Sequence, residues 1–406
     1  MVGTMAKIDD SVKKKVPELR FKGFTDEWEE RKLGEFTTSF SGGTPSAGNS
    51  SYYKGDIPFI RSGEINSDKT ELFLTEDGLK NSSAKMVSVG DILYALYGAT
   101  SGEVGISQIN GAINQAILAI KPIGGYSSHF IMQWLKLQKQ KIIDKYLQGG
   151  QGNLSGSIVK DLILNIPNFE EQQKIGSFFK QLDDTIALHQ RKLDLLKEQK
   201  KGFLQKMFPK NGAKVPELRF AGFADDWEER KLKDIAQFNP KTVLPDEFEY
   251  VDLESVVGTE MISHRTESKD QAPSRAQRLA QKGDVFYQTV RPYQMNNYLY
   301  DLPYDNYVFS TGYAQMRPNI DSYFLLNSVQ NKQFVQHVLD RSTGTSYPAI
   351  NSSDLSNIEI HVPSKLSEQQ KIGAFFQSID DTIALHQRKL DLLKEQKKGF
   401  LQKMFV

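Results

Sequence analysis

Three absences narrow the chemistry open to this 406-residue chain: it has no cysteine, no long apolar run and none of the short motifs of common enzymes. Without cysteine it forms no disulfides, thiolate metal sites or thiol nucleophiles, which fits a reducing cytoplasm. No apolar run approaches the roughly 18 residues of a membrane helix, and the first residues lack the apolar core of a signal peptide. We therefore expect a cytoplasmic protein with no membrane partner.

The missing motifs are those that bind phosphates or present a nucleophile. There is no G-x-G-x-x-G after a strand pattern, no G-x-x-x-x-G-K-[ST] and no G-x-S-x-G elbow. Asn239-Pro240 begins like a motif of adenine methyltransferases, but Lys241-Thr242 follows it, so a turn is the simpler interpretation. We expect no catalytic residue, no metal site and no cofactor in this chain, and we expect the chemistry to belong to partner chains.

The chain also lacks an excess of either charge, because 51 basic and 50 acidic side chains leave a net charge of +1. A non-specific nucleic-acid binder is usually more basic. Any contact with DNA must therefore use local groups of basic and polar side chains.

The chain contains a long internal repeat. The segment KVPELRFKGFTDEWEERKL (Lys15–Leu33) returns as KVPELRFAGFADDWEERKL (Lys214–Leu232), and DDTIALHQRKLDLLKEQKKGFLQKMF is identical at Asp183–Phe208 and Asp380–Phe405. The repeat offset of about 200 residues is far longer than the roughly 20 to 50 residues of a solenoid repeat. Each half therefore consists of an opening motif, a variable block and a helical segment.

The variable blocks, Gly34–Asn168 and Lys233–Lys365, differ in sequence but keep a common pattern. GDILYALYG (Gly90–Gly98) corresponds to GDVFYQTVR (Gly283–Arg291). Short apolar runs bounded by turn residues predict strands, at residues 56–60, 91–96, 116–120, 284–290 and 357–362. Two longer patterns predict helices at His129–Leu147 and Tyr323–Leu339. Each block is expected to be an α+β domain.

The identical segments predict long helices with a heptad seam. Apolar residues recur at alternating steps of four and three, with one histidine in each copy at an a position. The seam residues are Ile175, Phe179, Leu182, Ile186, His189, Leu193, Leu196 and Phe203, and in the second copy Ile372, Phe376, Ile379, Ile383, His386, Leu390, Leu393 and Phe400. Lys200 and Lys397 interrupt both seams at a d position. We expect the two helices to pair antiparallel about a pseudo-two-fold axis, with the histidines setting register rather than binding metal.

A chain with an opening motif, a variable block and a long helix, all present twice, resembles the specificity subunits of type I restriction–modification systems. The resemblance rests on PELRF-x-GF-x-x-x-WEERKL at Pro17–Leu33 and Pro216–Leu232, and on EQQKIG-x-FF, which begins at Glu171 and Glu368 and leads into the identical helices. Further segments look like parts of target-recognition domains: Ser41–Ser46, Tyr52–Ile65, Leu96–Ile106, Phe248–Val256 and Thr343–Leu355. The resemblance covers nearly the whole chain.

The resemblance implies a division into a tail (residues 1–15), a first target-recognition domain (16–168), a first spacer helix (169–212), a second target-recognition domain (213–365) and a second spacer helix (366–406). It further implies that each variable domain reads one half of a bipartite, asymmetric site in double-stranded DNA, while the helices set the unread spacer. Two copies of an adenine methyltransferase subunit and two copies of a motor-endonuclease subunit would complete the complex and carry S-adenosylmethionine, ATP and magnesium. A partner present twice needs two alike surfaces, whereas two different half-sites need different variable blocks.

Base recognition requires side chains that match the donor and acceptor patterns of base edges, carried on loops of a rigid scaffold. On this basis the candidate DNA-binding residues are Lys54, Arg61, Ser62, Tyr97, Gly98, Thr100, Ser101, Gln151 and Asn153 in the first block, and Arg291, Tyr293, Gln294, Asn296, Thr345, Ser346 and Tyr347 in the second. For each residue taken alone, a surface turn is an equally good interpretation.

Two alternatives stay open at this point. The chain could be a bivalent module for a ligand other than DNA, held by a coiled coil, or an enzyme whose site has no recognisable motif. The opening motif also has two interpretations: Trp28 and Trp227 cap each domain against the helices, or the charged WEERKL segment contacts another subunit.

Overall fold

The chain folds into two compact units, each of which contains one variable block and part of both long helices. The computed structural model describes residues 16–147, 153–210 and 212–406. The first unit comprises Met1–His189 and Lys389–Val406, and the second comprises Gln190–Arg388. The expected N-terminal tail, residues 1–15, lies outside the described residues.

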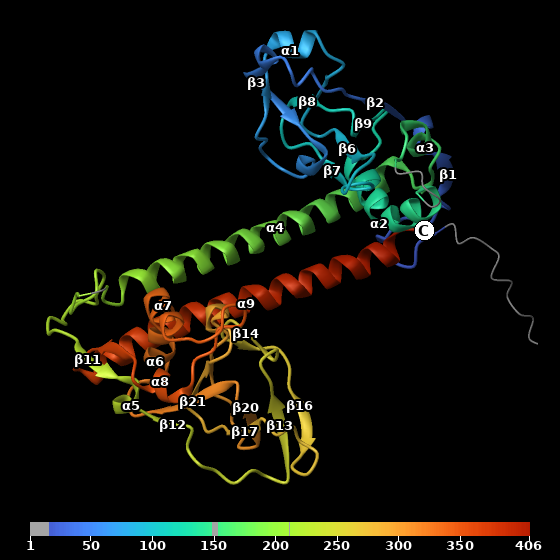
Figure 1. Cartoon of the computed structure of the whole chain (residues 1–406). Coiled ribbons are helices and arrows are strands. Elements are labelled where there is room, and N and C mark those ends of the chain that lie inside the picture. Colours follow the sequence, from blue (N-terminus) through green and yellow to red (C-terminus); the bar gives the residue numbers. More distant parts are fainter. Residues whose placement is uncertain (1–15, 148–152, 211) are drawn as a thin grey trace, which may run out of the picture. The chain divides into compact units, whose positions relative to one another are not determined.

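The first unit contains two four-stranded sheets and a two-stranded ribbon (Figure 1). One sheet has the order β2 (Thr37–Ser41), β9 (Ile117–Pro122), β6 (Ile92–Ala95), β7 (Val104–Ile106). The other has the order β4 (Phe73–Leu74), β3 (Tyr53–Ile60), β8 (Gly111–Ile113), β5 (Lys85–Val87), with β3 and β8 parallel. The ribbon pairs β1 (Glu29–Lys32) with β10 (Ile163–Ile166), and the helices are α1 (Glu76–Lys80), α2 (Ser128–Tyr146) and α3 (Gly156–Lys160).

The second unit repeats this arrangement strand for strand. Its sheets have the orders β12 (Ala236–Phe238), β21 (Tyr313–Pro318), β18 (Val285–Gln288), β19 (Tyr298–Leu299), and β16 (Arg265–Ser268), β13 (Glu247–Val251), β20 (Tyr307–Ser310), β17 (Ala276–Leu279). Again one inner pair, β13 and β20, is parallel. The ribbon is β11 (Glu228–Lys231) with β22 (Glu359–Val362), an added hairpin pairs β14 (Val256–Val257) with β15 (Glu260–Met261), and the short helices are α5 (Leu232–Ile235), α6 (Ser322–Val329), α7 (Lys332–Asp340) and α8 (Ser352–Ser356).

One predicted helix is two helices. We expected Tyr323–Leu339 to be continuous, but α6 ends at Val329 and α7 begins at Lys332. The Asn331 side chain accepts a hydrogen bond from Gln333 N (2.9 Å), and an asparagine in this role starts a new helix. The apolar periodicity continues through the break, so periodicity alone did not reveal it.

Two long helices, α4 (Phe169–Lys206) and α9 (Leu366–Met404), follow the ribbons. Asn168 caps the start of α4 by accepting a hydrogen bond from Glu171 N (2.9 Å), and Pro209 lies just beyond its end. Because α4 and α9 each pass from one unit into the other, each unit holds the first half of one helix and the second half of the other.

Within each unit the two half-helices pack antiparallel. In the first unit Phe178 lies against Phe400 (ring centroids 5.1 Å apart), and in the second Phe203 lies against Phe375 (4.9 Å). Advancing along α4 from Phe178 to Asp183 moves the contact back along α9, from Phe400 to Lys397. These pairs confirm the expected α+β fold with antiparallel long helices and an internal repeat.

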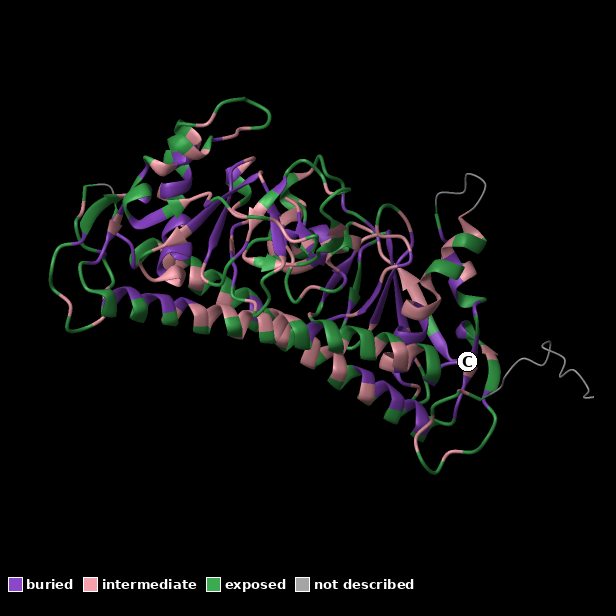
Figure 2. Cartoon of the chain, turned by 90° about the horizontal axis from the view of Figure 1, so that it is seen from below, coloured by how far each residue is buried: buried purple, intermediate pink, exposed green. Residues whose placement is uncertain are grey.

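The core of each unit lies where the opening motif, the sheet and the helix pair meet. In the first unit Trp28, which is 2% exposed, packs edge-on against Phe130 (5.7 Å) and Phe405 (6.4 Å). In the second unit Trp227 makes the same contacts with Phe324 (5.7 Å) and Phe208 (6.1 Å). The tryptophans therefore pack the opening motif against α2 or α6 and against the segment that directly follows one long helix. Figure 2 shows buried residues in the strands and along parts of the helices.

Candidate nucleic-acid interface

In the second unit, two loops far apart in sequence are hydrogen-bonded to each other beyond the end of β18. Arg291 N donates to Pro348 O (2.8 Å), Ile350 N donates to Thr289 O (3.0 Å), and Val290 forms a β-bridge with Ala349. The predicted residues Arg291, Tyr293, Gln294 and Asn296 on one loop are thereby brought beside Thr345, Ser346 and Tyr347 on the other. We name this loop pair, residues 289–297 and 342–350, the second loop pair.

Arg291 is held in an uncommon conformation on this surface. Its φ is +55°, in the left-handed region that a residue with a side chain occupies at a cost. Its guanidinium carbon lies 4.5 Å from the centroid of the Tyr347 ring, and that tyrosine is 63% exposed. The arrangement holds a cation over an exposed aromatic ring, which suits both cation–π stacking and contact with guanine.

The other candidates of the second loop pair divide into exposed and anchoring side chains. Tyr293, Thr345 and Ser346 are exposed. Asn296 accepts a hydrogen bond from Gly258 N (2.8 Å) and so holds the β14–β15 hairpin against the loop. Gln294 Oε1 accepts from Gln288 Nε2 (2.9 Å), which leaves the amide nitrogen of Gln294 available as a donor.

The first unit has an equivalent pair of loops beyond β6. Tyr97 forms a β-bridge with Asn153, and Leu154 N donates to Leu96 O (2.8 Å). Ser101 Oγ donates to Gly98 O (2.9 Å), which closes the turn that also carries half-buried Thr100. We name residues 96–103 with residue 153 the first loop pair. Gln151, also predicted to contact DNA, lies outside the described residues.

The two loop pairs share one backbone feature at equivalent positions. Gly98 has a φ of +84° and Arg291 a φ of +55°, and both directly follow the residue that forms the β-bridge. The backbone therefore turns the same way in both units, while the first presents no side chain and the second presents a guanidinium.

Arg61, Ser62 and Lys54 lie in or beside the other sheet of the first unit. The Arg61 guanidinium donates to Glu64 (2.8 Å) and to Glu71 (2.8 Å), and these hydrogen bonds raise its pKa. Burial acts to raise the pKa of Glu64, but its bonds with Arg61 and neighbouring donors prevail and lower it to about 2. Ser62 begins the short 3-10 helix Ser62–Glu64, which directly follows Arg61. Lys54 lies on β3 with a φ of +64°. Arg61 is therefore engaged by two carboxylates of its own unit.

The predicted seam residues of the long helices fall into two groups. Six are buried: Ile175, Phe179, Leu193, Ile372, Phe376 and Leu390. The remainder, Leu182, Ile186, His189, Leu196, Phe203, Ile379, Ile383, His386, Leu393 and Phe400, are half-buried. Each helix therefore buries its seam at two residues near its start and at one residue near its middle.

Sequence reasoning missed the ion pairs that fix this seam. Lys200, which interrupts the heptad pattern, lies 2.5 Å from Asp380, and Lys397 lies 2.5 Å from Asp183. Burial raises the pKa of Asp380, although Lys200 opposes this. The interruptions therefore become register-fixing contacts, and the clue was that lysine and aspartate recur in both copies.

A second missed feature joins the opening motif to the long helices. Arg20 makes two hydrogen bonds with the fully buried Glu171 (2.6 and 2.7 Å), and Arg219 makes two with Glu368 (2.7 and 2.9 Å). Leu19 N also donates to Lys403 O, and Leu218 N to Lys206 O, each at 2.8 Å. The opening motif therefore binds the first turn of one long helix and the last turn of the other.

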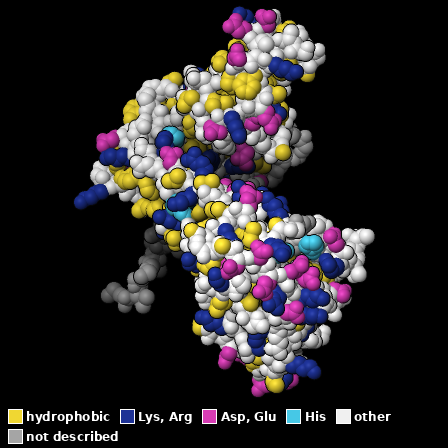
Figure 3. Space-filling model, turned by 90° about the vertical axis from the view of Figure 1, so that its left-hand side faces the viewer, with side chains coloured by type: hydrophobic (Ala, Val, Ile, Leu, Met, Phe, Trp, Pro, Cys, Tyr) yellow, Lys and Arg dark blue, Asp and Glu magenta, His cyan; other side chains and the backbone are white. Residues whose placement is uncertain are grey.

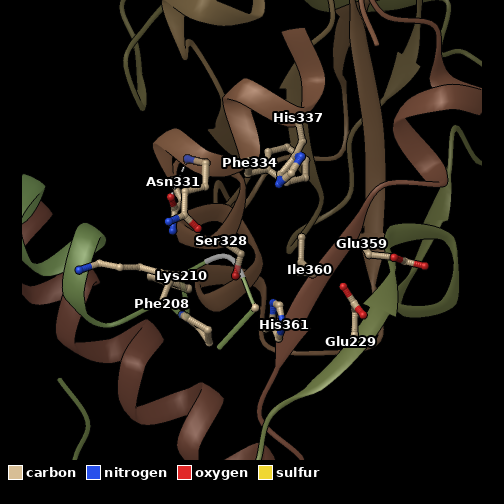
Figure 4. A pocket seen from close by; sticks show the side chains of 13 residues that line it. Phe208, Lys210, Glu229, Ser328, Asn331, Phe334, His337, Glu359, Ile360 and His361 are labelled. Carbon is tan, nitrogen blue, oxygen red and sulfur yellow. Dashed lines mark hydrogen bonds between the residues drawn. The ribbon is translucent and has the colours of Figure 1, made fainter. Parts of the chain in front are cut away.

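A cavity of about 280 Å³ lies on the ribbon side of the second unit, apart from the loop pair (Figure 4). His337 on α7 and His361 on β22 reach it, together with Glu229 and Glu359 of the ribbon.

Within residues 16–147, 153–210 and 212–406, no three histidine, aspartate or glutamate side chains converge in a group that could hold a metal ion. Over the same residues no helix is long and apolar enough to cross a membrane. On the face drawn in Figure 3, acidic and basic side chains are intermixed.

Comparison with known proteins gives a consistent result. Residues 25–198 and 224–395 each match the family model described as the type I restriction modification DNA specificity domain. The type I restriction enzyme MjaVIII specificity subunit of Methanocaldococcus jannaschii is 21% identical over 401 residues, covering 93% of this chain and 91% of that protein. The HindI specificity subunit of Haemophilus influenzae is 25% identical over 196 residues, or 45% of this chain and 41% of that protein.

Solved structures share the fold. The crystal structure of the S subunit of a type I restriction–modification system from M. genitalium superposes with a TM-score of 0.67 at 16% identity, over 96% of this chain and 99% of that chain. A chain solved in a study of complex assembly and conformational transition of the type I system gives a TM-score of 0.50 at 17% identity, over 93% of this chain and 97% of that chain.

Proposed function

This chain belongs to the type I restriction–modification DNA specificity family, and we propose that it reads a bipartite, asymmetric target in double-stranded DNA as the non-catalytic subunit of a cytoplasmic methylation and restriction complex. Each loop pair contacts one half of the target. The resemblance read from the sequence motifs is thereby confirmed at the level of the family.

The observation that carries the proposal is the contrast between a framework that the two units share and loops that differ between them. The two units have the same strand order and the same tryptophan–phenylalanine contacts. At the equivalent left-handed position, however, one carries Gly98 and the other Arg291. Sequence in DNA is read by side chains at base edges, so different side chains on one backbone suit two different half-sites.

Two copies of an adenine methyltransferase subunit dock on the long helices in this proposal. In the first unit Leu188 and Leu392 are both 58% exposed, and in the second unit Leu195 and Leu385 are also 58% exposed. Counting from the Asp183–Lys397 ion pair, five residues forward on α4 and five back on α9, places Leu188 level with Leu392. Exposed leucines repeated in this way suit a partner that is present twice. Two motor-endonuclease subunits join that complex, and S-adenosylmethionine, ATP and magnesium bind to the partner subunits.

The long helices set the length of DNA between the half-sites in this proposal. At about 1.5 Å per residue, a helix of 38 residues is roughly 57 Å long, against about 34 Å for one turn of DNA. Inserting four residues, about one helical turn, after both Gln190 and Gln387 should lengthen the unread spacer without altering either half. An active complex with an unchanged spacer would contradict this role.

The central experiment is to co-express the chain with the methyltransferase encoded beside it, in a host whose genome lacks the system, and to map methyladenine. We expect one bipartite motif with a fixed unread gap. Exchanging the second variable block, residues 233–365, for that of another family member should change only one half of the motif. If the complex assembles and methylates nothing, the chain is better described as a bivalent module for another ligand.

A further inference from the structure

The second unit contains a cavity of about 590 Å³ between the last turns of α4, the β14–β15 hairpin and the second loop pair. Lys197 and Lys201 line it from α4, Lys332 lines it from the start of α7, and Gln294 and Met295 line it from the loop. This cavity lies beside the residues that we propose to read DNA, whereas the ribbon-side cavity does not.

The cavity is more basic than the chain as a whole. Four lysines line it, and its two carboxylates are Glu260 and Asp380. Asp380 is already paired with Lys200 at 2.5 Å, so Lys197, Lys201 and Lys332 face the single remaining carboxylate. Lys201 lies 3.3 Å from Glu198 in an exposed pair, and such pairs contribute little. The lining therefore attracts an anion, while leucine, valine and lysine stems provide apolar walls.

The first unit is built differently at the equivalent place. Lys136 and Gln330 each lie nine residues after their helix-capping residues, Ser127 and Asp321. In the first unit α2 runs on through Lys136, which lies half-buried near Lys397 and has a pKa lowered by burial. In the second unit the helix has ended, and Gln330 Nε2 instead donates to Met295 O (3.2 Å). The helix break thus places Gln330 in the cavity lining and attaches it to the loop.

We propose that this cavity binds the sugar–phosphate backbone of the DNA that flanks the second half-site, with Lys197, Lys201 and Lys332 placed against phosphates. The inference rests on the proposed function and adds a second kind of contact to it. Phosphate contacts carry no sequence information, but they fix the register in which base-reading side chains meet the groove. Because Met295 and Gln294 belong to both the cavity and the loop pair, backbone binding and base reading are mechanically joined at this point.

The test uses the identical helical sequence as its own control. Lys197 and Lys201 on α4 correspond to Lys394 and Lys398 on α9, 197 residues later, with the same neighbours in sequence. The variants are Lys197→Gln with Lys201→Gln, and Lys394→Gln with Lys398→Gln, each assembled with the methyltransferase. Affinity for a duplex that carries the mapped target is measured as a function of salt, and assembly is checked by mass measurement.

For the α4 variant we expect the negative slope of log affinity against log salt to become shallower by about 1.8. Each of the two lost phosphate contacts reduces the magnitude of the slope by about 0.9. The methylated motif should stay the same, and the α9 variant should change the slope by less than half as much. Equal changes in both variants, or an unchanged slope in the α4 variant, would overturn the proposal. Loss of assembly with an unchanged slope would assign the cavity to an acidic protein surface instead. Failure of the unmodified complex to bind any target duplex would refute the proposed function, which is a different result.

Discussion

The two units of this protein are similar in what they bury and different in what they display. Both place an ion pair between adjacent strand ends, Lys121 with Asp91 (2.9 Å) in the first and Arg317 with Asp284 (2.8 Å) in the second. Directly after β3 and β13, however, the charge has the opposite sign in the two units. The first unit has the basic Arg61, and the second has the acidic Asp252, which pairs with Arg265. Packing therefore constrains the framework of both units, while the charge at these strand ends differs between them.

The largest expected effect breaks a contact that both units share. Glu171→Ala or Glu368→Ala leaves a guanidinium that is only 12–14% exposed without its partner, which should cost about 3–5 kcal/mol in the unit concerned. Trp227 Nε1 also approaches Glu368 Oε1 (3.4 Å), so the second unit should lose slightly more. Urea unfolding with hydrogen exchange resolved by unit measures both.

Glu170→Ala serves as the control for these variants. Its pair with Lys174 is exposed, so the change should be below about 0.5 kcal/mol. If the Glu171 and Glu170 variants lose the same stability, the buried pair is not what holds the opening motif to the helix.

The next effect distinguishes the two register-fixing ion pairs. Asp380→Lys should cost about 2 kcal/mol because it places two lysines together, and adding Lys200→Asp should restore most of the loss. The same exchange at Asp183 and Lys397 should restore less, because Asp183 also accepts a hydrogen bond from Gln133 Nε2 (2.7 Å). Thermal unfolding of the single and double variants measures the coupling. Equal restoration in both units would show that Gln133 contributes nothing.

A smaller effect concerns the left-handed position of the loop pairs. Arg291→Gly should relieve backbone strain yet weaken binding to the second half-site by about 1–3 kcal/mol, with the first half-site unaffected. Arg291→Lys should bind almost as weakly, since lysine lacks the planar fork of arginine. Fluorescence anisotropy with duplexes altered in one half at a time measures this. A loss spread evenly over both halves would contradict the assignment of one loop pair to each half.

The smallest effect is a pH dependence of the first unit. The folded-state pKa of Glu64 is about 2, below the ordinary value of 4.5, so its ion pairs are complete above about pH 5. Their contribution should be lost as the pH falls from about 4.5 towards 2. Because Arg61 is 40% exposed, the loss should be about 1 kcal/mol, and Glu64→Gln should remove it. An unchanged pH profile in Glu64→Gln would show that other carboxylates dominate.

Local patterns in the sequence predicted the framework well. The heptad spacing from Ile175 to Phe203 specified the long helix and its buried face, and the identical copy made the antiparallel partner the simplest choice. The repeat of the opening motif indicated that Trp28 and Trp227 would have the same role. Each of these inferences depends either on the spacing of residues within one helix or on a direct comparison of two nearly identical segments.

What the sequence did not reveal depends on contacts between distant residues. Tyr97 and Asn153 lie 56 residues apart, and only the fold shows that they form one bridge. The pairing of Lys200 with Asp380 becomes visible only once the antiparallel register is known. The break after Val329 was hidden because capping by Asn331 and the hydrogen bond of Gln330 with Met295 prevail over a helical apolar pattern.

The identity of the two long helices also bears on how one chain behaves among many. The repeated segment is identical over 26 residues at α4 and α9. The α4 helix of a neighbouring chain therefore presents to α4 the same apolar seam as α9 of its own chain. The intramolecular pair forms because covalent connection gives the partner segments a high effective concentration. At cellular concentrations far below that value each chain should therefore pair with itself, whereas crowded overexpression should favour chains that have exchanged helices.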